Sequence, residues 1–294
     1  MTDKTNIFSL EEAILSTLRY YSLFSYPLLA NEIHRFLNIS ASLEEVEAKL
    51  SLMLLNKEIY VTPAGFYTMN NQPQWTNRRL KGNRLAEELL EKSNRYIRKI
   101  IQFPFVKSVA ISGSLSKYYT DEDGDIDYFI ITDKNRLWIA RTLLHLFKKT
   151  SFIRKNEHYY CMNYFVDETA LEIDQKNVYS AIETVTLIPV FNQALISKLK
   201  QTNKDWVLKY LPNEEFNEDL RYMLKSKRFF WKGFAETFIE WLGADQLNLK
   251  FMKMTDNKWR KKWESKSYPM DKYDQAFFTS PHVSKNHPAN YQSQ

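Results

Sequence analysis

The stretch VAISGSLSKYYTDEDGDIDYFIIT, residues 109–132, decides the expected fold. A hydrophobic strand ends at Gly113–Ser114, and ten residues later Asp125–Ile126–Asp127 leads into a second hydrophobic strand. Glycine has no side chain, so its backbone can approach a phosphate closely. Ser114 and the amides after it, at the start of a short helix expected over 115–118, can donate hydrogen bonds to phosphate oxygens. The pattern predicts a phosphate-binding turn at Gly113 and Ser114.

Two aspartates follow the turn with a spacing that predicts a metal site. Residues i and i+2 of a strand face the same side, so Asp125 and Asp127 present their carboxylates together. Two such carboxylates repel each other unless a cation lies between them. Mg²⁺ prefers one or two carboxylates together with substrate phosphates and water. We therefore expect Asp125 and Asp127 to hold Mg²⁺ (or Mn²⁺), with Lys117 neutralising phosphate charge.

Two other interpretations of this acidic turn were weighed. Aspartates alternate from Asp121 to Asp127, as in a calcium loop. An EF-hand needs Gly at its sixth position and Glu at its twelfth, whereas this chain has Gly124 at the fourth and Thr132 at the twelfth. Calcium is therefore disfavoured. A solvated acidic loop without a ligand stays open as an alternative.

The order of strand, Gly-Ser, ten residues, Asp-x-Asp, strand and helix resembles the catalytic core of the polymerase beta-like nucleotidyltransferase superfamily. Residues 111–114 and 125–128 match its pattern, although its members commonly have Ser where Gly124 stands. The resemblance implies an α+β fold with a mixed sheet. It also implies transfer of a nucleoside monophosphate from a nucleoside triphosphate to an acceptor.

The resemblance implies a role for each matching residue. Asp125 and Asp127 would be the catalytic metal ligands, and Gly113 and Ser114 would hold the triphosphate. The acceptor, whether small molecule, RNA or protein, is left open.

The superfamily usually supplies a third carboxylate from a later strand. The strand expected over YYCMNYFV has Asn163 at that position, and an amide cannot accept a proton. Glu172, on a strand expected to return over 170–173, is one substitute, and Glu183 is a more distant one. A one-metal transferase and a catalytically silent scaffold or regulator are both compatible with two carboxylates.

The N-terminal residues 1–75 predict three helices and a two-stranded hairpin, an order that resembles a winged-helix domain. Capping boxes, in which a serine and a glutamate three residues later cap a helix start, are expected at Ser9 and Ser42. The region carries a net charge of −3, and glutamates lead its third helix, where a DNA reader needs Lys or Arg. We expect protein docking rather than DNA reading.

The remaining chain is divided into four segments. They are a basic helical connector (76–100), the nucleotidyltransferase core (101–176), a helical C-terminal region (177–266) and an irregular tail (267–294). Residues 76–107 sum to +6 and residues 221–266 to +7, so these two basic blocks are the candidate nucleic-acid surfaces.

Composition excludes several classes. No apolar run approaches the roughly 20 residues of a membrane span, and the N-terminal sequence lacks the pattern of a secretory signal. Cys161 is the single cysteine, which excludes an internal disulfide and a cysteine-based zinc site. A cytoplasmic location is expected. We interpret Cys161, His145 and the aromatic residues of 229–241 as packing or interface residues.

Overall fold

The computed structural model describes residues 9–152, 157–225 and 229–286. The chain forms two compact units, each assembled from separate segments. Unit 1 comprises Met1–Leu85, Gln175–Val185 and Lys204–Asn217, and unit 2 comprises Ala86–Asp174, Thr186–Asn203 and Glu218–Gln294. The chain therefore passes repeatedly from one unit to the other.

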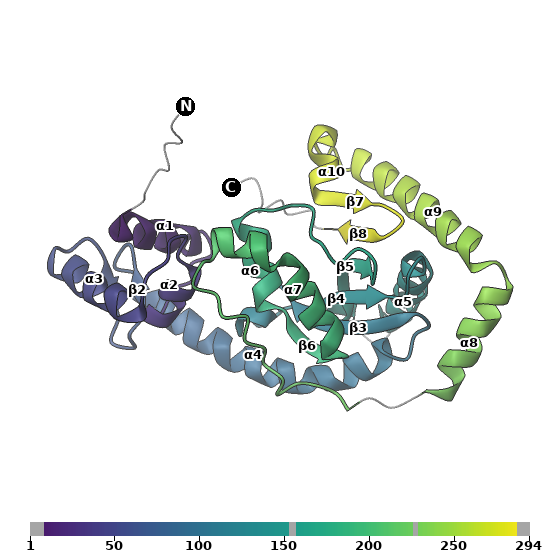
Figure 1. The fold of residues 1–294 in the computed structure, drawn as a ribbon, viewed down its shortest axis with the longest axis horizontal. Helices are drawn as coiled ribbons and strands as arrows, with labels where there is room; N and C mark the ends of the chain where they lie inside the picture. The colour runs from purple at the N-terminus through teal and green to yellow at the C-terminus, as the bar shows by residue number, and fades with distance from the viewer. Residues whose placement is uncertain (1–8, 153–156, 226–228, 287–294) are drawn as a thin grey trace. The chain divides into compact units, whose positions relative to one another are not determined.

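Unit 1 begins with three helices and a two-stranded antiparallel sheet (Figure 1). Its elements are α1 (Leu10–Ser22), α2 (Ala30–Phe36), α3 (Leu43–Leu55), β1 (Tyr60–Val61) and β2 (Tyr67–Thr68). The capping boxes predicted at Ser9 and Ser42 are confirmed, and they begin α1 and α3. The expected order of helices and strands is present, while its assignment as a winged helix stays a prediction.

Late residues of the chain complete unit 1. Arg35 pairs with Glu214 through two hydrogen bonds of 2.6 and 3.1 Å. The Asn213 side chain donates to the carbonyls of His34 and Ile39 at 2.9 and 3.0 Å. The N-terminal helices are thus held by a segment about 180 residues further along the chain.

Unit 2 contains a mixed sheet of six strands in the order β6-β3-β4-β5-β8-β7. The β4–β5 pair is parallel, and the other pairs are antiparallel. This sheet with its helices confirms the α+β class. The strands are β3 (Val106–Ser112), β4 (Asp127–Thr132), β5 (Cys161–Asp167), β6 (Ile188–Phe191), β7 (Phe277–Thr279) and β8 (Val283–Asn286).

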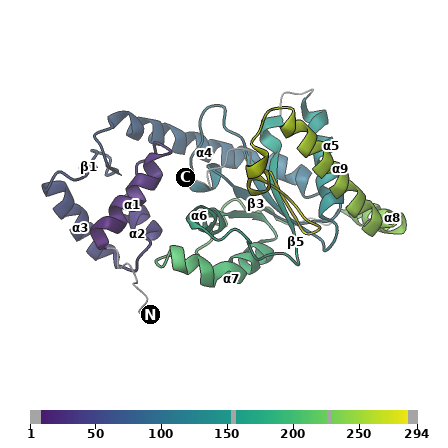
Figure 2. The ribbon, with the colours of Figure 1, turned by 90° about the horizontal axis from the view of Figure 1, so that it is seen from above.

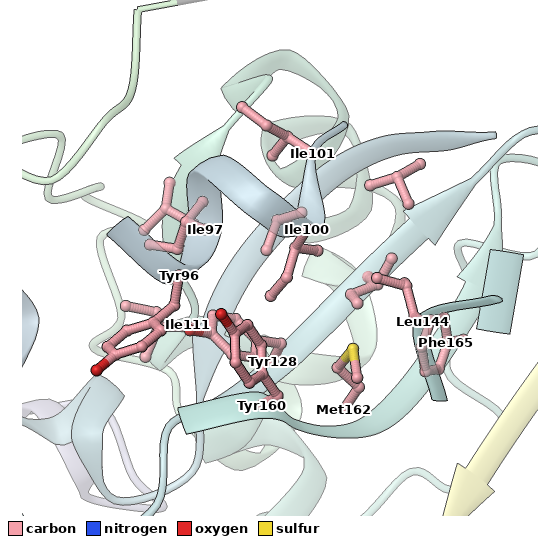
Figure 3. Packing of buried hydrophobic residues seen from close by; sticks show 14 of the residues in the cluster. Tyr96, Ile97, Ile100, Ile101, Ile111, Tyr128, Leu144, Tyr160, Met162 and Phe165 are labelled. Carbon is pink, nitrogen blue, oxygen red and sulfur yellow. The ribbon is translucent and has the colours of Figure 1, made fainter. Parts of the chain in front are cut away.

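Helices pack around this sheet and connect the units (Figures 1 and 2). In the core of unit 2, Tyr96, Ile97 and Ile100 pack beside Tyr128 and Tyr160 (Figure 3). The helices are α4 (Pro73–Ile100), α5 (Leu137–Phe152), α6 (Val178–Thr186), α7 (Gln193–Tyr210), α8 (Phe230–Trp241), α9 (Ala244–Glu264) and α10 (Tyr273–Ala276), with short 3-10 turns η1 (Leu115–Lys117), η2 (Glu157–Tyr160) and η3 (Met270–Lys272).

Three expectations about secondary structure were wrong. The tail from 267 is not irregular throughout, because β7 and β8 add to the sheet beside β5; residues 287–294 lie outside the described part. Residues 170–173 form no strand and instead follow a turn. Residues 188–191 form β6, antiparallel to β3, where helix had been expected. Each difference depends on pairing between distant segments, which local patterns do not reveal.

No helix within the described ranges combines the length and apolarity needed to cross a bilayer.

Candidate nucleotide site

The predicted site residues meet at one end of the sheet. Strand β3 ends at Ser112, which lies opposite Asp127, the first residue of the antiparallel strand β4. Asp127 lies in turn opposite Cys161, the first residue of the parallel strand β5. The end of β3 and the starts of β4 and β5 therefore share one edge of the sheet.

Gly113 brings the turn into direct contact with a carboxylate. Its φ of +67° is in the left-handed region, which side chains disfavour. A Cβ placed on Gly113 would lie 2.5 Å from Oδ2 of Asp127, closer than real Cβ atoms approach. Glycine is thus required twice at this position, by its backbone conformation and by the carboxylate beside it.

The residues after Gly113 form the expected short helix. The 3-10 turn η1 spans Leu115–Lys117 and begins after Ser114, which is exposed. The Lys117 ammonium donates a 2.9 Å hydrogen bond to the carbonyl of Gly113. Lys117 therefore places its positive charge at the turn itself.

Asp125 and Asp127 lie on either side of a residue that is already paired in extended form. The Ile126 amide donates to the His158 carbonyl at 3.2 Å, and its carbonyl accepts from the Cys161 amide at 3.1 Å. Alternation along such a segment places both aspartate side chains on one face. Asp125 is exposed and Asp127 is half-buried.

Asn163 is aimed at Asp127 by an irregularity in β5. Tyr128 pairs with Met162 and Phe129 with Tyr164, so Asn163 is an extra residue between these pairs. Its Nδ2 donates a 2.9 Å hydrogen bond to Oδ1 of Asp127. A bulge re-aims a side chain in this way and is over-represented next to active sites. A neutral amide therefore occupies the place where the third carboxylate was expected.

Neither substitute for that carboxylate joins the pair. Glu172 is exposed in the turn segment that follows β5, and Glu183 lies on α6 within unit 1. Among the described residues, no group of three His, Cys, Asp or Glu side chains is arranged to hold a metal ion. The acidic side chains of the candidate site are therefore Asp125 and Asp127.

Sequence reasoning missed two residues of the site. Cys161, expected only to pack, donates from Sγ to Oδ2 of Asp125 at 3.5 Å. Lys148 reaches from α5 to place its ammonium 3.8 Å from the same sulfur. Nothing in their sequence spacing indicates these contacts, because they depend on how α5 packs against β5.

The Cys161 thiol is held in its protonated form. Burial raises its pKa to about 12, and the Asp127 and Asp125 carboxylates add to the rise while Lys148 opposes it. A protonated thiol is a poor metal ligand, since metals bind the thiolate. The donors left to a cation are carboxylate oxygens, which suit Mg²⁺ or Mn²⁺ rather than Zn²⁺. Two carboxylates fit a Mg²⁺ ion that takes its other ligands from substrate phosphates and water.

A short ion-paired cluster holds the segment after η1. Tyr118 has a left-handed φ of 55° and donates its hydroxyl to Asp219. Asp219 also accepts from Arg221, at 2.8 Å from Nη2, and the Arg221 guanidinium lies 5.4 Å from the centre of the Tyr118 ring. This cluster brings one arginine of the basic block 221–266 beside the residue that follows the turn.

Comparison with known proteins gives one match. The family model of the nucleotidyltransferase domain matches residues 94–205, a range that includes Gly113, Ser114, Asp125, Asp127 and Asn163. No curated protein and no solved structure matches the chain. The match supports nucleotidyl transfer as the general activity of this domain.

The raised pKa of Cys161 predicts slow alkylation. With a pKa of about 12 in the fold and 9.0 without it, the thiolate at pH 8 is on the order of a thousandfold scarcer in the folded protein. Iodoacetamide should therefore modify native protein about that much more slowly than unfolded protein, as followed by intact-protein mass spectrometry. Asp125→Asn should speed the reaction and Asp123→Asn, on the same turn, should not. Equal rates for native and unfolded protein would contradict this environment for Cys161.

Proposed function

We propose that the chain transfers a nucleoside monophosphate from a nucleoside triphosphate to an acceptor hydroxyl, with Mg²⁺ held by Asp125 and Asp127. The observation that carries this proposal is the contact between the Gly113 turn and the Asp127 carboxylate, where a Cβ would lie 2.5 Å from Oδ2. A group bound at the turn is then adjacent to a cation bound at the carboxylates.

Each residue has a role in this proposal. Gly113 and Ser114 receive the triphosphate through backbone amides and the serine hydroxyl, and Lys117 offsets its charge. The acceptor oxygen attacks the α-phosphorus, the bond to the β-phosphate bridging oxygen breaks, and pyrophosphate leaves as the hydroxyl proton passes to solvent. A bound Mg²⁺ would supply charge neutralisation to the phosphates during this step.

A second candidate function is a nucleotidyltransferase-like scaffold that binds a partner without turnover. The hydrogen bond from Asn163 to Asp127, at the position expected for a third carboxylate, favours this alternative. An amide there neither accepts a proton nor adds charge to hold a second metal.

The deciding experiment offers each α-³²P-labelled nucleoside triphosphate to the full-length protein with Mg²⁺ and a cell extract. Transfer of label to an acceptor, with release of pyrophosphate, supports the transferase. Asn163→Asp serves as a second arm. Label transfer that appears only in Asn163→Asp, together with Mg²⁺-dependent nucleotide binding in both proteins, would favour the scaffold.

We propose further that the N-terminal region is a winged helix that docks protein and does not read DNA. The exposed start of α3 carries Glu44, Glu45 and Glu47, which repel phosphates. Further along α3, Leu52 and Leu55 are also exposed, at 55% and 78%, an arrangement suited to a protein contact. Nucleic acid, where bound, would be held by the basic blocks 76–107 and 221–266.

Charge removal in the full-length protein tests this assignment. Arg98 and Lys99 are exposed at the end of α4, so Arg98→Ala with Lys99→Ala should weaken any nucleic-acid binding and lower its salt dependence by about two phosphate contacts. The matched pair Lys49→Ala and Lys57→Ala, in the N-terminal region, should leave binding unchanged. Fluorescence anisotropy against a salt series measures both. Sequence-selective binding that depends on the N-terminal pair would show that this region reads DNA.

A further inference from the structure

Helix α8 turns its charged face toward the protein. Its charged residues are Lys232, Glu236 and Glu240, which follow one another at intervals of four and therefore share one face. Each is engaged within unit 2. Lys232 Nζ donates to the carbonyls of Ile101 (3.2 Å) and Val106 (2.6 Å), Glu236 accepts from the Phe105 amide (2.7 Å), and Glu240 pairs with Arg136 (2.6 Å).

The opposite face of α8 is aromatic and exposed. A surface helix normally buries its apolar face and solvates its charged one, so this arrangement is inverted. The helix lies at the periphery of unit 2 in both views (Figures 1 and 2). The exposed side chains are Phe230 (94%), Trp231 (47%), Phe234 (72%), Phe238 (51%), Trp241 (78%) and the adjoining Leu242 (54%).

The exposed area matches that of a protein interface. At about 150–250 Å² per aromatic side chain, these exposed fractions amount to roughly 500–850 Å². The largest apolar patch of a typical monomer is about 300–600 Å², and a standard interface buries about 800 Å² on each partner. The face is thus at or above the upper end for a monomer and within reach of a stable interface.

Small residues lie on the same face beside the large ones. Gly233 is exposed, and a Cβ built on it would meet nothing within 4 Å. Thr237 follows four residues later and is also exposed. An antiparallel copy of the helix, related by a two-fold axis between residues 235 and 236, places Phe238 opposite Gly233 and Phe234 opposite Thr237. Large residues then meet small ones along the whole pair.

We propose that α8 is a homodimer interface, in which the aromatic face packs antiparallel against the same face of a second copy of this chain. Such an interface is isologous, so one surface must complement itself, as the pairing of Phe238 with Gly233 does. A membrane surface is a poorer occupant. Helices that lie in a bilayer interface keep Lys or Arg on a polar face available to lipid headgroups, whereas every charge of α8 is used inside its own unit.

The test is the mass of the full-length protein in solution, measured by analytical ultracentrifugation over a micromolar concentration series. The expected mass is twice 35.1 kDa. Phe234→Ser with Phe238→Ser should raise the dissociation constant at least a hundredfold. The control Leu146→Ser removes a comparably exposed side chain (54%) from α5 and should leave the dimer intact.

Gly233→Leu separates self-association from other uses of the face. Open space surrounds Gly233, and leucine favours helix, so the folded single chain should tolerate this change. In the dimer the leucine would fill the place of Phe238 from the second copy, and the dissociation constant should rise at least tenfold. A monomeric wild-type protein overturns the proposal. Sedimentation of that monomer with phosphatidylserine vesicles would make a membrane the occupant instead. Equal dimerisation by wild type and Gly233→Leu also overturns the proposed packing.

Discussion

Asp127→Asn is expected to lower the affinity for a Mg²⁺-nucleoside triphosphate complex by more than about a hundredfold. Loss of residues that only support metal ligands already costs about 10- to 100-fold, and Asp127 is proposed as a ligand itself. The substitution is nearly isosteric, so folding should be retained. Removing one of two crowded carboxylates also relieves like-charge repulsion in the metal-free protein. Isothermal titration calorimetry with and without Mg²⁺ measures the effect.

The control for this prediction is Asp123→Asn. Asp123 is exposed on the same acidic turn and differs from Asp127 in having no assigned role at the site. It should bind the complex as the wild type does. If Asp127→Asn keeps wild-type affinity for the complex, the metal ligands have been misassigned. Equal losses in both variants would indicate a general charge effect and not a metal site.

Gly113→Val is expected to abolish nucleotide binding. The left-handed φ disfavours any side chain, at a cost of roughly 1–2 kcal/mol, and the new Cβ would collide with the Asp127 carboxylate. Either the turn or the carboxylate must then move. We expect a loss of at least about a hundredfold, against a two- to tenfold loss for Ser114→Ala, which removes one hydrogen bond worth about 0.5–1.5 kcal/mol.

A matched pair of alanine variants isolates the collision from the backbone strain. Gly65 also has a left-handed φ, of +80°, but its Cβ would meet only Leu29, at a comfortable 3.9 Å. Gly65→Ala and Gly113→Ala should share the strain, and only Gly113→Ala should displace Asp127. Urea denaturation should therefore show a larger loss of stability for Gly113→Ala. Normal nucleotide binding by Gly113→Val would mean that the phosphate binds elsewhere.

Much of the fold followed from local patterns. The hydrophobic runs before Gly113 and after Asp125 became β3 and β4, and the serines at 9 and 42 capped helices as expected. These features depend on residues close in the sequence. Strands β6, β7 and β8 could not be predicted, because short apolar segments become strands only when a distant edge is available to pair with them.

The candidate site shows the same division between local and distant effects. Gly113, Asp125 and Asp127 lie within 15 residues, and their motif located them together. The reach of Lys148 to Cys161 depends on how α5 packs against the sheet, and the aim of Asn163 depends on a bulge. Neither effect has a signature in a single sequence. The charge and hydrogen bonding of the pocket were therefore less predictable than its position.

The alternation of segments between the two units has a consequence for synthesis. Arg35 and the carbonyls of α2 find partners at Asn213 and Glu214, so the N-terminal helices cannot complete their contacts until those residues have left the ribosome. The sheet must wait longer, since β7 and β8 come from 277–286. A nascent chain stalled before residue 213 should therefore be digested readily by proteases within 9–75. Fragments cut at residue 75 or 100 would likewise lack part of each unit, which favours point substitutions in the whole chain for dissecting this protein.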